Sequence, residues 1–219
     1  MSSADVEACR GCEGRCCTAY IVPVTGYDLW RIAQAQRLAP VVFVQREPED
    51  YPTATGFRLR PGGPTYGLSL RHQLVRHSHR PCIFLLQLKE GVKRCGIYAH
   101  RPLACQTYPM RLQQGQPGPR SDMLCPHGSW SGLGHDLAGW QERLARQEWE
   151  WELYASVVKA WNASLEAQLT ESGYVFEQYL DYLVNAYDHI DRHLAAHSEQ
   201  PAIASLEREL AALASAYIS

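Results

Sequence analysis

The chain has 219 residues, of which 46% are apolar and 20% are charged, and its formal net charge is −2. This composition excludes an intrinsically disordered chain and is sufficient for one ordinary core or two small ones. Residues 1–17 contain no apolar run of the kind found in signal peptides, and no segment approaches membrane-spanning length. We therefore expect a soluble cytoplasmic protein with no membrane partner.

Charge is divided unevenly along the chain. Residues 57–120 contain eleven Lys and Arg against one acid, Glu90, whereas residues 136–219 contain fourteen Asp and Glu against five Lys and Arg. Either the two parts pack together or lie in solvent, or the basic part binds an anion. The partner expected on the second interpretation is an unidentified protein or a small anionic molecule, and not a nucleic acid.

Eight cysteines are the strongest chemical signal in the sequence. In a reducing compartment, clustered cysteines are metal ligands or redox thiols more often than disulfides. Cys9 and Cys12 have the spacing at which one turn presents two thiolates to one ion, and Gly14 allows the backbone to bend closely around it. Three arrangements are open for the adjacent Cys16 and Cys17. They bind different metals, or one is a ligand and the other supports it, or the two form a vicinal disulfide.

The elements before the central cysteines are expected to be short. Residues 19–24 predict a strand, and Thr25 with Asp28 is a capping-box-like start for a helix that ends near residue 38. Residues 41–44 fit either a helix or a strand. Two further strands are expected in the loop-rich part that follows, at residues 57–60 and 66–71.

A hairpin is predicted in the centre of the chain. Residues 82–86 and 92–97 are apolar runs separated by a turn with the sequence Lys-Glu-Gly. Neighbouring strands here would bring Cys82 close to Cys95, which favours one shared site.

The segment after the hairpin is predicted to be a turn or a single short helix. Pro102 suits its first position, where the missing amide hydrogen costs nothing, and Cys105 would face back one turn later. Residues 113–119 are rich in Gln, Gly and Pro and are expected to form a loop. Cys125 supplies the last thiol.

Two groups of histidines are alternative ligands. The first group precedes the hairpin and contains His72, His77 and His79. The second has the four-residue spacing of a two-histidine metal site on one helix face: His189, His193 and His197. With eight cysteines available, we favour thiolate ligands over both groups.

The end of the chain is predicted to be helical. Apolar residues recur at three- and four-residue steps, which predicts helices over residues 137–169, 174–197 and 201–218. We interpret most of the aromatic residues between 174 and 187 as core. The Gly- and Ser-rich residues 128–134 then separate a cysteine-rich domain, residues 1–134, from a helical layer packed on it, residues 135–219. The expected fold class is α+β, with short strands and one or two helices in the first domain.

The cysteine pattern resembles a known family. The opening Cys-x-x-Cys-x-x-x-Cys-Cys is followed by Cys-x-Ile-Tyr-x-x-Arg-Pro-x-x-Cys-x-x-Tyr-Pro, which begins at Cys95. Together these motifs resemble the bacterial-type YkgJ cysteine-cluster proteins, a zinc- or iron-chelating domain that is similar to the cysteine-rich part of flagellin lysine N-methylase.

The cysteine spacing and the resemblance together predict a metal centre. The expected cofactor is zinc or an iron–sulfur cluster such as a 4Fe-4S cluster. All eight thiols are candidate ligands: Cys9, Cys12, Cys16, Cys17, Cys82, Cys95, Cys105 and Cys125. The resemblance further implies that three side chains of the central motif lie beside the cofactor: Tyr98, Arg101 and Tyr108.

Three functions agree with the sequence, which contains no standard nucleotide-binding or hydrolase motif. The first is a metal or iron–sulfur protein whose centre supports a reaction, such as methyl transfer to a protein side chain. The second is a structural zinc module that presents a basic surface, including Arg71, Arg76 and Arg80, to an anionic partner. The third is a thiol redox protein. Whether the chain is an enzyme stays open at this point.

Overall fold

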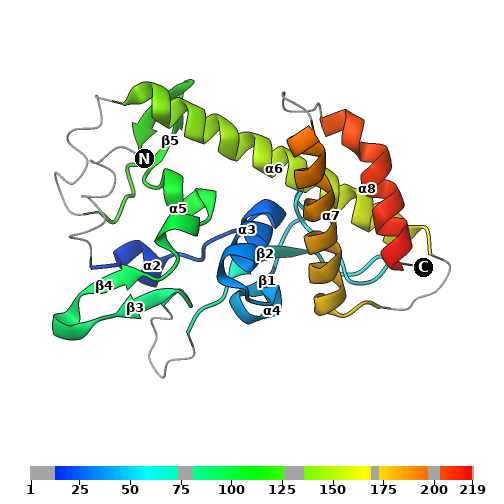
Figure 1. Ribbon diagram of the computed structural model, residues 1–219, viewed down its shortest axis with the longest axis horizontal. Helices are drawn as coiled ribbons and strands as arrows, with labels where there is room; N and C mark the ends of the chain where they lie inside the picture. The colour runs from blue at the N-terminus through cyan, green and yellow to red at the C-terminus, as the bar shows by residue number, and fades with distance from the viewer. Residues whose placement is uncertain (1–12, 74–80, 126–135, 169–172, 197–202, 219) are drawn as a thin grey trace. The chain divides into compact units, whose positions relative to one another are not determined.

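The computed structural model describes most of the chain: residues 13–73, 81–125, 136–168, 173–196 and 203–218 (Figure 1). Small two-stranded antiparallel sheets occupy its earlier part and long helices its later part, which confirms the predicted α+β class. No helix among the described residues is long and apolar enough to cross a membrane.

The chain forms two compact units, each made from two segments. The first comprises Met1–Val22 and Leu70–Glu148, and the second comprises Pro23–Ser69 and Trp149–Ser219. The expected linker at residues 128–134 lies outside the described residues. The division into residues 1–134 and 135–219 therefore stays a prediction, as does the packing of one part on the other.

The first unit contains the short elements that carry the cysteines. In chain order they are α2 (Arg15–Ala19), β3 (Leu85–Gln87), the 3-10 turn η1 (Lys89–Gly91), β4 (Lys93–Cys95), the 3-10 turn η2 (Tyr98–His100), α5 (Leu103–Thr107), β5 (Met110–Gln113), β6 (Gln116–Pro119) and the start of α6 (Leu137–Glu166).

The second unit contains the remaining elements, which are mostly helical. They are α3 (Gly26–Gln36), α4 (Pro40–Phe43), β1 (Val44–Pro48), β2 (Tyr66–Leu70) except its last residue, the rest of α6, α7 (Phe176–Ala196) and α8 (Ile203–Ile218). The three long helices confirm the predicted helical tail, and α4 with β1 shows that residues 41–44 hold both a helix and the start of a strand.

Two predicted strands are wrong. Residues 19–24 end a helix and then run without regular structure, and only Pro23 makes a bridge, to Ser69. The bridge is flanked by two hydrogen bonds, from the Val24 amide to the Leu68 carbonyl at 3.0 Å and from the Leu70 amide to the Val22 carbonyl at 2.9 Å, and it stays an isolated bridge. In residues 57–60, only Phe57 makes a bridge, to Tyr66.

The predicted loop over residues 113–119 is a hairpin. Strands β5 and β6 pair from Met110 opposite Pro119 to Gln113 opposite Gln116. Gln114 and Gly115 form the turn with φ of 52° and 79°. Two consecutive positive φ values match the twist of the strands in a tight hairpin. The Gln114-Gly115 dipeptide is therefore sufficient to reverse the chain between β5 and β6.

The core of the second unit is aromatic. Tyr179 and Tyr182 of α7 are fully buried, as is Trp161 of α6. Tyr179 stacks on Phe57 with ring centroids 4.0 Å apart, and Trp161 donates through Nε1 to the Arg58 carbonyl at 2.7 Å. The aromatic residues that we interpreted as core therefore do form the core of this unit.

A buried ion pair joins α3 to α6 in the second unit. Thr25 and Asp28 form the predicted capping box at the start of α3. The Arg31 guanidinium donates to Asp28 at 2.7 Å and to both carboxylate oxygens of Glu150 at 3.0 Å. Asp28 and Glu150 are 2% and 1% exposed, so Arg31 offsets two carboxylates that solvent hardly reaches.

Replacing Arg31 with Met should destabilise the protein. The substitution removes the shared cation of two buried carboxylates, and breaking such a pair costs about 3 kcal/mol. Urea unfolding followed by circular dichroism measures the loss. The exposed Arg192 of α7 provides the control, because Arg192→Met should change stability by less than about 0.5 kcal/mol. Equal stability of the two variants would contradict the structural role of Arg31.

Candidate metal centre

The cysteine-bearing α2 begins against the β3–β4 hairpin. Gly14 precedes the helix with a φ of 69°, and a Cβ atom at this position would lie 3.1 Å from Leu85 Cδ1 and 3.5 Å from Lys93 Cβ. A larger residue would be strained there by the positive φ and would crowd Leu85. Gly14 therefore allows the start of the cysteine segment to lie directly on the hairpin.

Cys16 and Cys17 are close neighbours but are not joined by a disulfide. Both are free thiols, and their sulfur atoms are 3.9 Å apart, almost twice the length of an S–S bond of about 2.05 Å. The Cys17 carbonyl accepts a hydrogen bond of 2.8 Å from the Cys82 amide. This bond connects the opening cysteines to the segment before the hairpin.

Cys82 lies just outside the hairpin, in a loop fixed by polar contacts. It forms a bridge with His72, and Gln73 donates through Nε2 to the carbonyls of Cys82 at 3.1 Å and Leu85 at 2.7 Å. Sequence reasoning missed Gln73, because a single glutamine among basic residues gives no signal of such a role. The first hairpin strand was predicted over residues 82–86, but β3 begins at Leu85, so Cys82 lies before the paired residues.

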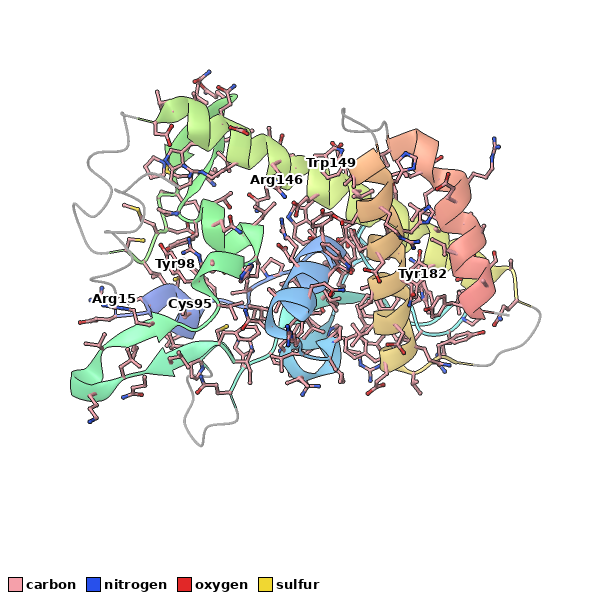
Figure 2. The ribbon with its side chains drawn as sticks, viewed as in Figure 1. Arg15, Cys95, Tyr98, Arg146, Trp149 and Tyr182 are labelled. Carbon is pink, nitrogen blue, oxygen red and sulfur yellow. The ribbon has the colours of Figure 1, made fainter. Side chains whose placement is uncertain are left out.

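Cys95 lies in β4, the second strand of the hairpin, and Cys105 lies in α5. Cys95 ends β4 opposite the buried Leu85, which the register places on the same face of the hairpin. Cys105 lies in the first turn of α5, where its amide donates to the Pro102 carbonyl at 2.9 Å. Pro102 is the N-cap of α5, one position before the one predicted for it. Figure 2 shows Cys95 and Tyr98 in the region of the hairpin and α5.

Four thiols influence one another electrostatically. Burial raises the pKa of Cys82 to about 11, and the nearby Cys95 and Cys16 thiols add to this rise. Burial also raises the pKa of Cys105 well above its usual value, with further contributions from Cys82, Cys16 and Cys95. The contact with Cys17, followed by burial, raises the pKa of Cys16. Ionising one of these thiols makes ionising the next one harder.

One cation opposes this effect at α5. The Arg101 side chain lowers the pKa of Cys105, against the larger effect of burial. Its guanidinium carbon lies 3.9 Å from the centroid of the Tyr98 ring, a cation–π distance. Two of the three side chains expected beside the cofactor, Arg101 and Tyr98, are therefore in contact, and Arg101 acts on a candidate ligand.

Tyr108 and Cys125 belong to a neighbouring cluster. The Tyr108 hydroxyl accepts from the Leu124 amide at 2.6 Å, and its ring lies 5.6 Å from that of Tyr20. Tyr20 in turn donates to the Asp122 carbonyl at 3.0 Å. These contacts hold the segment that ends in Cys125 against the residues that follow α2.

The chemistry of this donor set fits a thiophilic metal. Four mutually interacting thiols with one guanidinium nearby suit zinc or iron, which thiolate ligands select. Within the described ranges, however, no three His, Cys, Asp or Glu side chains are placed so that they could hold one ion. Cys9 and Cys12 lie outside these ranges, so their role as ligands stays a prediction.

A comparison with models of protein families shows to which family the chain belongs. The model named CxxCxxCC and described as "Putative zinc- or iron-chelating domain" matches residues 8–126, more than half of the 219 residues. The chain belongs to the CxxCxxCC family. The match contains all eight cysteines and gives no support to the resemblance to flagellin lysine N-methylase. No solved structure matches the chain.

The histidines that the sequence offered as alternative ligands lie in several parts of the chain. The bridge places His72 opposite Cys82, whereas His77, His79 and His197 lie outside the described residues. In the second unit, His189 Nε2 and a carboxylate oxygen of Glu209 of α8 are hydrogen-bond partners. This contact agrees with our preference for thiolate ligands over His189.

Zinc addition to the metal-free protein should release protons. Because the pKa values of Cys16, Cys82 and Cys105 are raised, these thiols are protonated at pH 7, and a zinc ion that takes them as thiolates displaces their protons. An indicator dye in weakly buffered, reduced protein measures the release. Magnesium prefers oxygen ligands and should give no signal. Zinc binding without proton release would show that the ligands are not these thiols.

Proposed function

We propose that the chain holds zinc or iron in a thiolate centre formed by Cys16, Cys82, Cys95 and Cys105, whose sulfur atoms draw closer together around the ion than they lie in the metal-free structure. The observation that carries this proposal is that Cys82 and Cys105 lie close enough to Cys16 and Cys95 for these thiols to raise their pKa values. Their segments are separate in sequence but are connected by short backbone bonds and by the hairpin register. Membership of a zinc- or iron-chelating family supports the same chemistry independently.

A bound cation offsets the electrostatic repulsion between these thiols in their ionised forms. Its positive charge stabilises the thiolate forms, which otherwise repel one another in a poorly solvated place. The protein segments present the sulfur atoms: α2 carries Cys16, β4 carries Cys95 and α5 carries Cys105. Holding all of them on one ion would fix these short elements relative to one another. A role in stabilising the first unit is therefore part of the proposal.

Three finer expectations from the sequence lie beyond this proposal or beside it. Four thiolates also suit a 4Fe-4S cluster, so the cluster stays an alternative to a single ion. Methyl transfer is not part of the proposal, because the family description names metal chelation and gives no support for a transferase activity. The basic surface for an anionic partner stays a sequence prediction, since Arg76 and Arg80 lie outside the described residues.

Replacing the proposed ligands should remove the metal. We expect Cys82→Ser and Cys105→Ser to reduce bound zinc or iron to less than about a tenth of the wild-type content and to lower the melting temperature, because a serine hydroxyl stays protonated and binds these ions poorly. Elemental analysis of anaerobically purified protein provides the measurement. Cys125→Ser replaces a thiol outside the proposed four, so it is the comparison variant and should retain its metal. A similar loss in Cys125→Ser would contradict the choice of four thiols.

The colour of the purified protein should identify the metal. Four thiolates around one ion leave no open position, which is typical of a structural zinc site, so we expect a colourless protein with one zinc per chain. The visible absorption spectrum and elemental analysis test this together. A brown protein that contains acid-labile sulfide would show that the thiolates hold an iron–sulfur cluster and not zinc. The proposal of a thiolate centre would then still hold.

A further inference from the structure

One face of the β3–β4 hairpin carries three apolar side chains and an arginine. Leu86 pairs with Arg94 in the hairpin register. The Leu88 amide donates to the Val92 carbonyl at 2.7 Å, which extends this register toward the turn. Side chains of directly opposite residues, and of residues two apart on one strand, point to the same side of a sheet. These four residues therefore share one face of the hairpin, which we call the outer face.

The inner face of the hairpin carries Leu85 and Lys93 and lies against the start of α2 (Figure 1). A Cβ atom at Gly14 would be 3.1 Å from Leu85 Cδ1 and 3.5 Å from Lys93 Cβ. On the outer face, by contrast, the three apolar side chains are 37% to 49% exposed. Single exposed apolar residues are common, but neighbouring ones are typical of a surface that binds another molecule.

The outer face also carries positive charge. Arg94 donates through Nη1 to the Lys93 carbonyl at 2.9 Å, and the exposed Lys89 lies in the turn η1. A partner that covers Leu86 also removes water from Arg94, because the two residues are directly opposite each other. A guanidinium that loses water needs an acceptor, and a carboxylate is a strong one. The charge of this face therefore fits a partner that presents carboxylates beside its apolar side chains.

A partner helix fits this hairpin better than a partner strand. A strand would add at an edge of the sheet through backbone hydrogen bonds. The Leu85 carbonyl, however, already accepts from Gln73 Nε2 at 2.7 Å, and the Lys93 carbonyl accepts from Arg94. A helix needs no backbone hydrogen bonds to a sheet and packs its apolar stripe directly on the apolar face.

A lipid bilayer fits the outer face less well than a protein helix. Lys89 and Glu90 lie in the turn at the end of the hairpin, between Leu88 and Val92. Inserting the hairpin end first would carry these charged residues into hydrocarbon ahead of the apolar ones, which is costly.

We propose that the outer face of the β3–β4 hairpin binds an amphipathic helix of a partner protein, with Asp and Glu beside the apolar stripe of that helix. The stripe covers Leu86, Leu88 and Val92, and a carboxylate pairs with Arg94. This interaction goes beyond the proposed metal centre and does not rest on it.

The test is the binding of a fluorescein-labelled peptide to the purified full chain, measured by fluorescence anisotropy. In this peptide, leucines recur at three- and four-residue steps and glutamates fill the neighbouring positions. A control peptide has lysine in place of each glutamate. The wild type should bind the acidic peptide about tenfold more tightly than the basic one, although the whole chain is itself slightly acidic. No binding of the acidic peptide, or equal binding of both, would overturn the proposal.

Removing a leucine tests the apolar part of the contact. Leu88→Ser should weaken binding of the acidic peptide by about tenfold, because a buried leucine is lost. Leu137→Ser is the matched control, since Leu137 is 48% exposed but lies at the start of α6. This variant should bind within about twofold of the wild type. Circular dichroism of each variant checks that it folds. Equal affinities of the two folded variants would contradict the role of the outer face.

Reversing a charge tests the electrostatic part. Arg94→Glu should reverse the preference, so that the variant binds the basic peptide more tightly than the acidic one. Arg111→Glu makes the same change of net charge at an exposed position of β5 and should keep the preference of the wild type. Reversal in both variants would show that net charge alone selects the peptide.

Two further measurements distinguish other occupants of the outer face. Vesicles of phosphatidylserine and phosphatidylcholine test a lipid surface by co-sedimentation, and analytical ultracentrifugation tests a second copy of the chain. Vesicle binding or dimer formation that Leu88→Ser abolishes and Leu137→Ser retains would overturn the partner helix in favour of that occupant. Wild-type protein that stays monomeric and free of vesicles while binding the acidic peptide supports the proposal.

Discussion

The first unit depends on the cost of placing several thiolates close together. Each ionised sulfur opposes ionisation of the others, and burial opposes it further, as the raised pKa values of Cys82 and Cys105 show. Without a cation, these side chains are therefore neutral thiols that make weak hydrogen bonds. In the proposed centre, a metal would turn these neutral thiols into a direct connection between the short elements of the unit. Backbone hydrogen bonds, such as the one from the Cys82 amide to the Cys17 carbonyl, bring the cysteine-bearing segments together.

The two units treat buried charge differently. In the second unit, Arg31 lies against Asp28 and Glu150, so the protein supplies the opposite charge itself and the network is complete without any ligand. In the first unit, burial and neighbouring thiols raise the pKa values of Cys82 and Cys105, so these side chains are neutral. The first arrangement stabilises a fold without a ligand, whereas in the second a charge would appear only when the proposed metal takes the thiols as thiolates.

The sequence predicted the features that depend on local rules. Helix periodicity, the capping box at Thr25 and Asp28, and the central hairpin all follow from residues near one another in the chain. The missed features depend on contacts between distant residues or on one backbone angle. Gln73 acquires its role only when Cys82 and Leu85 lie beside it, and the β5–β6 hairpin depends on Gln114 adopting a positive φ, which glutamine seldom does. The cysteines could be recognised as candidate ligands by type and spacing, but their grouping required the fold, because Cys16 and Cys82 are far apart in sequence.

The order of segments along the chain has a consequence for biosynthesis. Pro23–Ser69, which belongs to the second unit, separates Cys17 from Cys82, so the first unit is interrupted by residues that form part of another core. A ribosome therefore exposes the opening cysteines well before Cys82, Cys95 and Cys105 exist. Bringing these segments together closes a long loop, which is entropically costly until the intervening residues have become compact. With the proposed centre, metal supplied early in translation would meet an incomplete set of donors and would be held weakly. Stable loading of the nascent chain would then belong to a late stage of its synthesis, after the interrupting segment has left the ribosome.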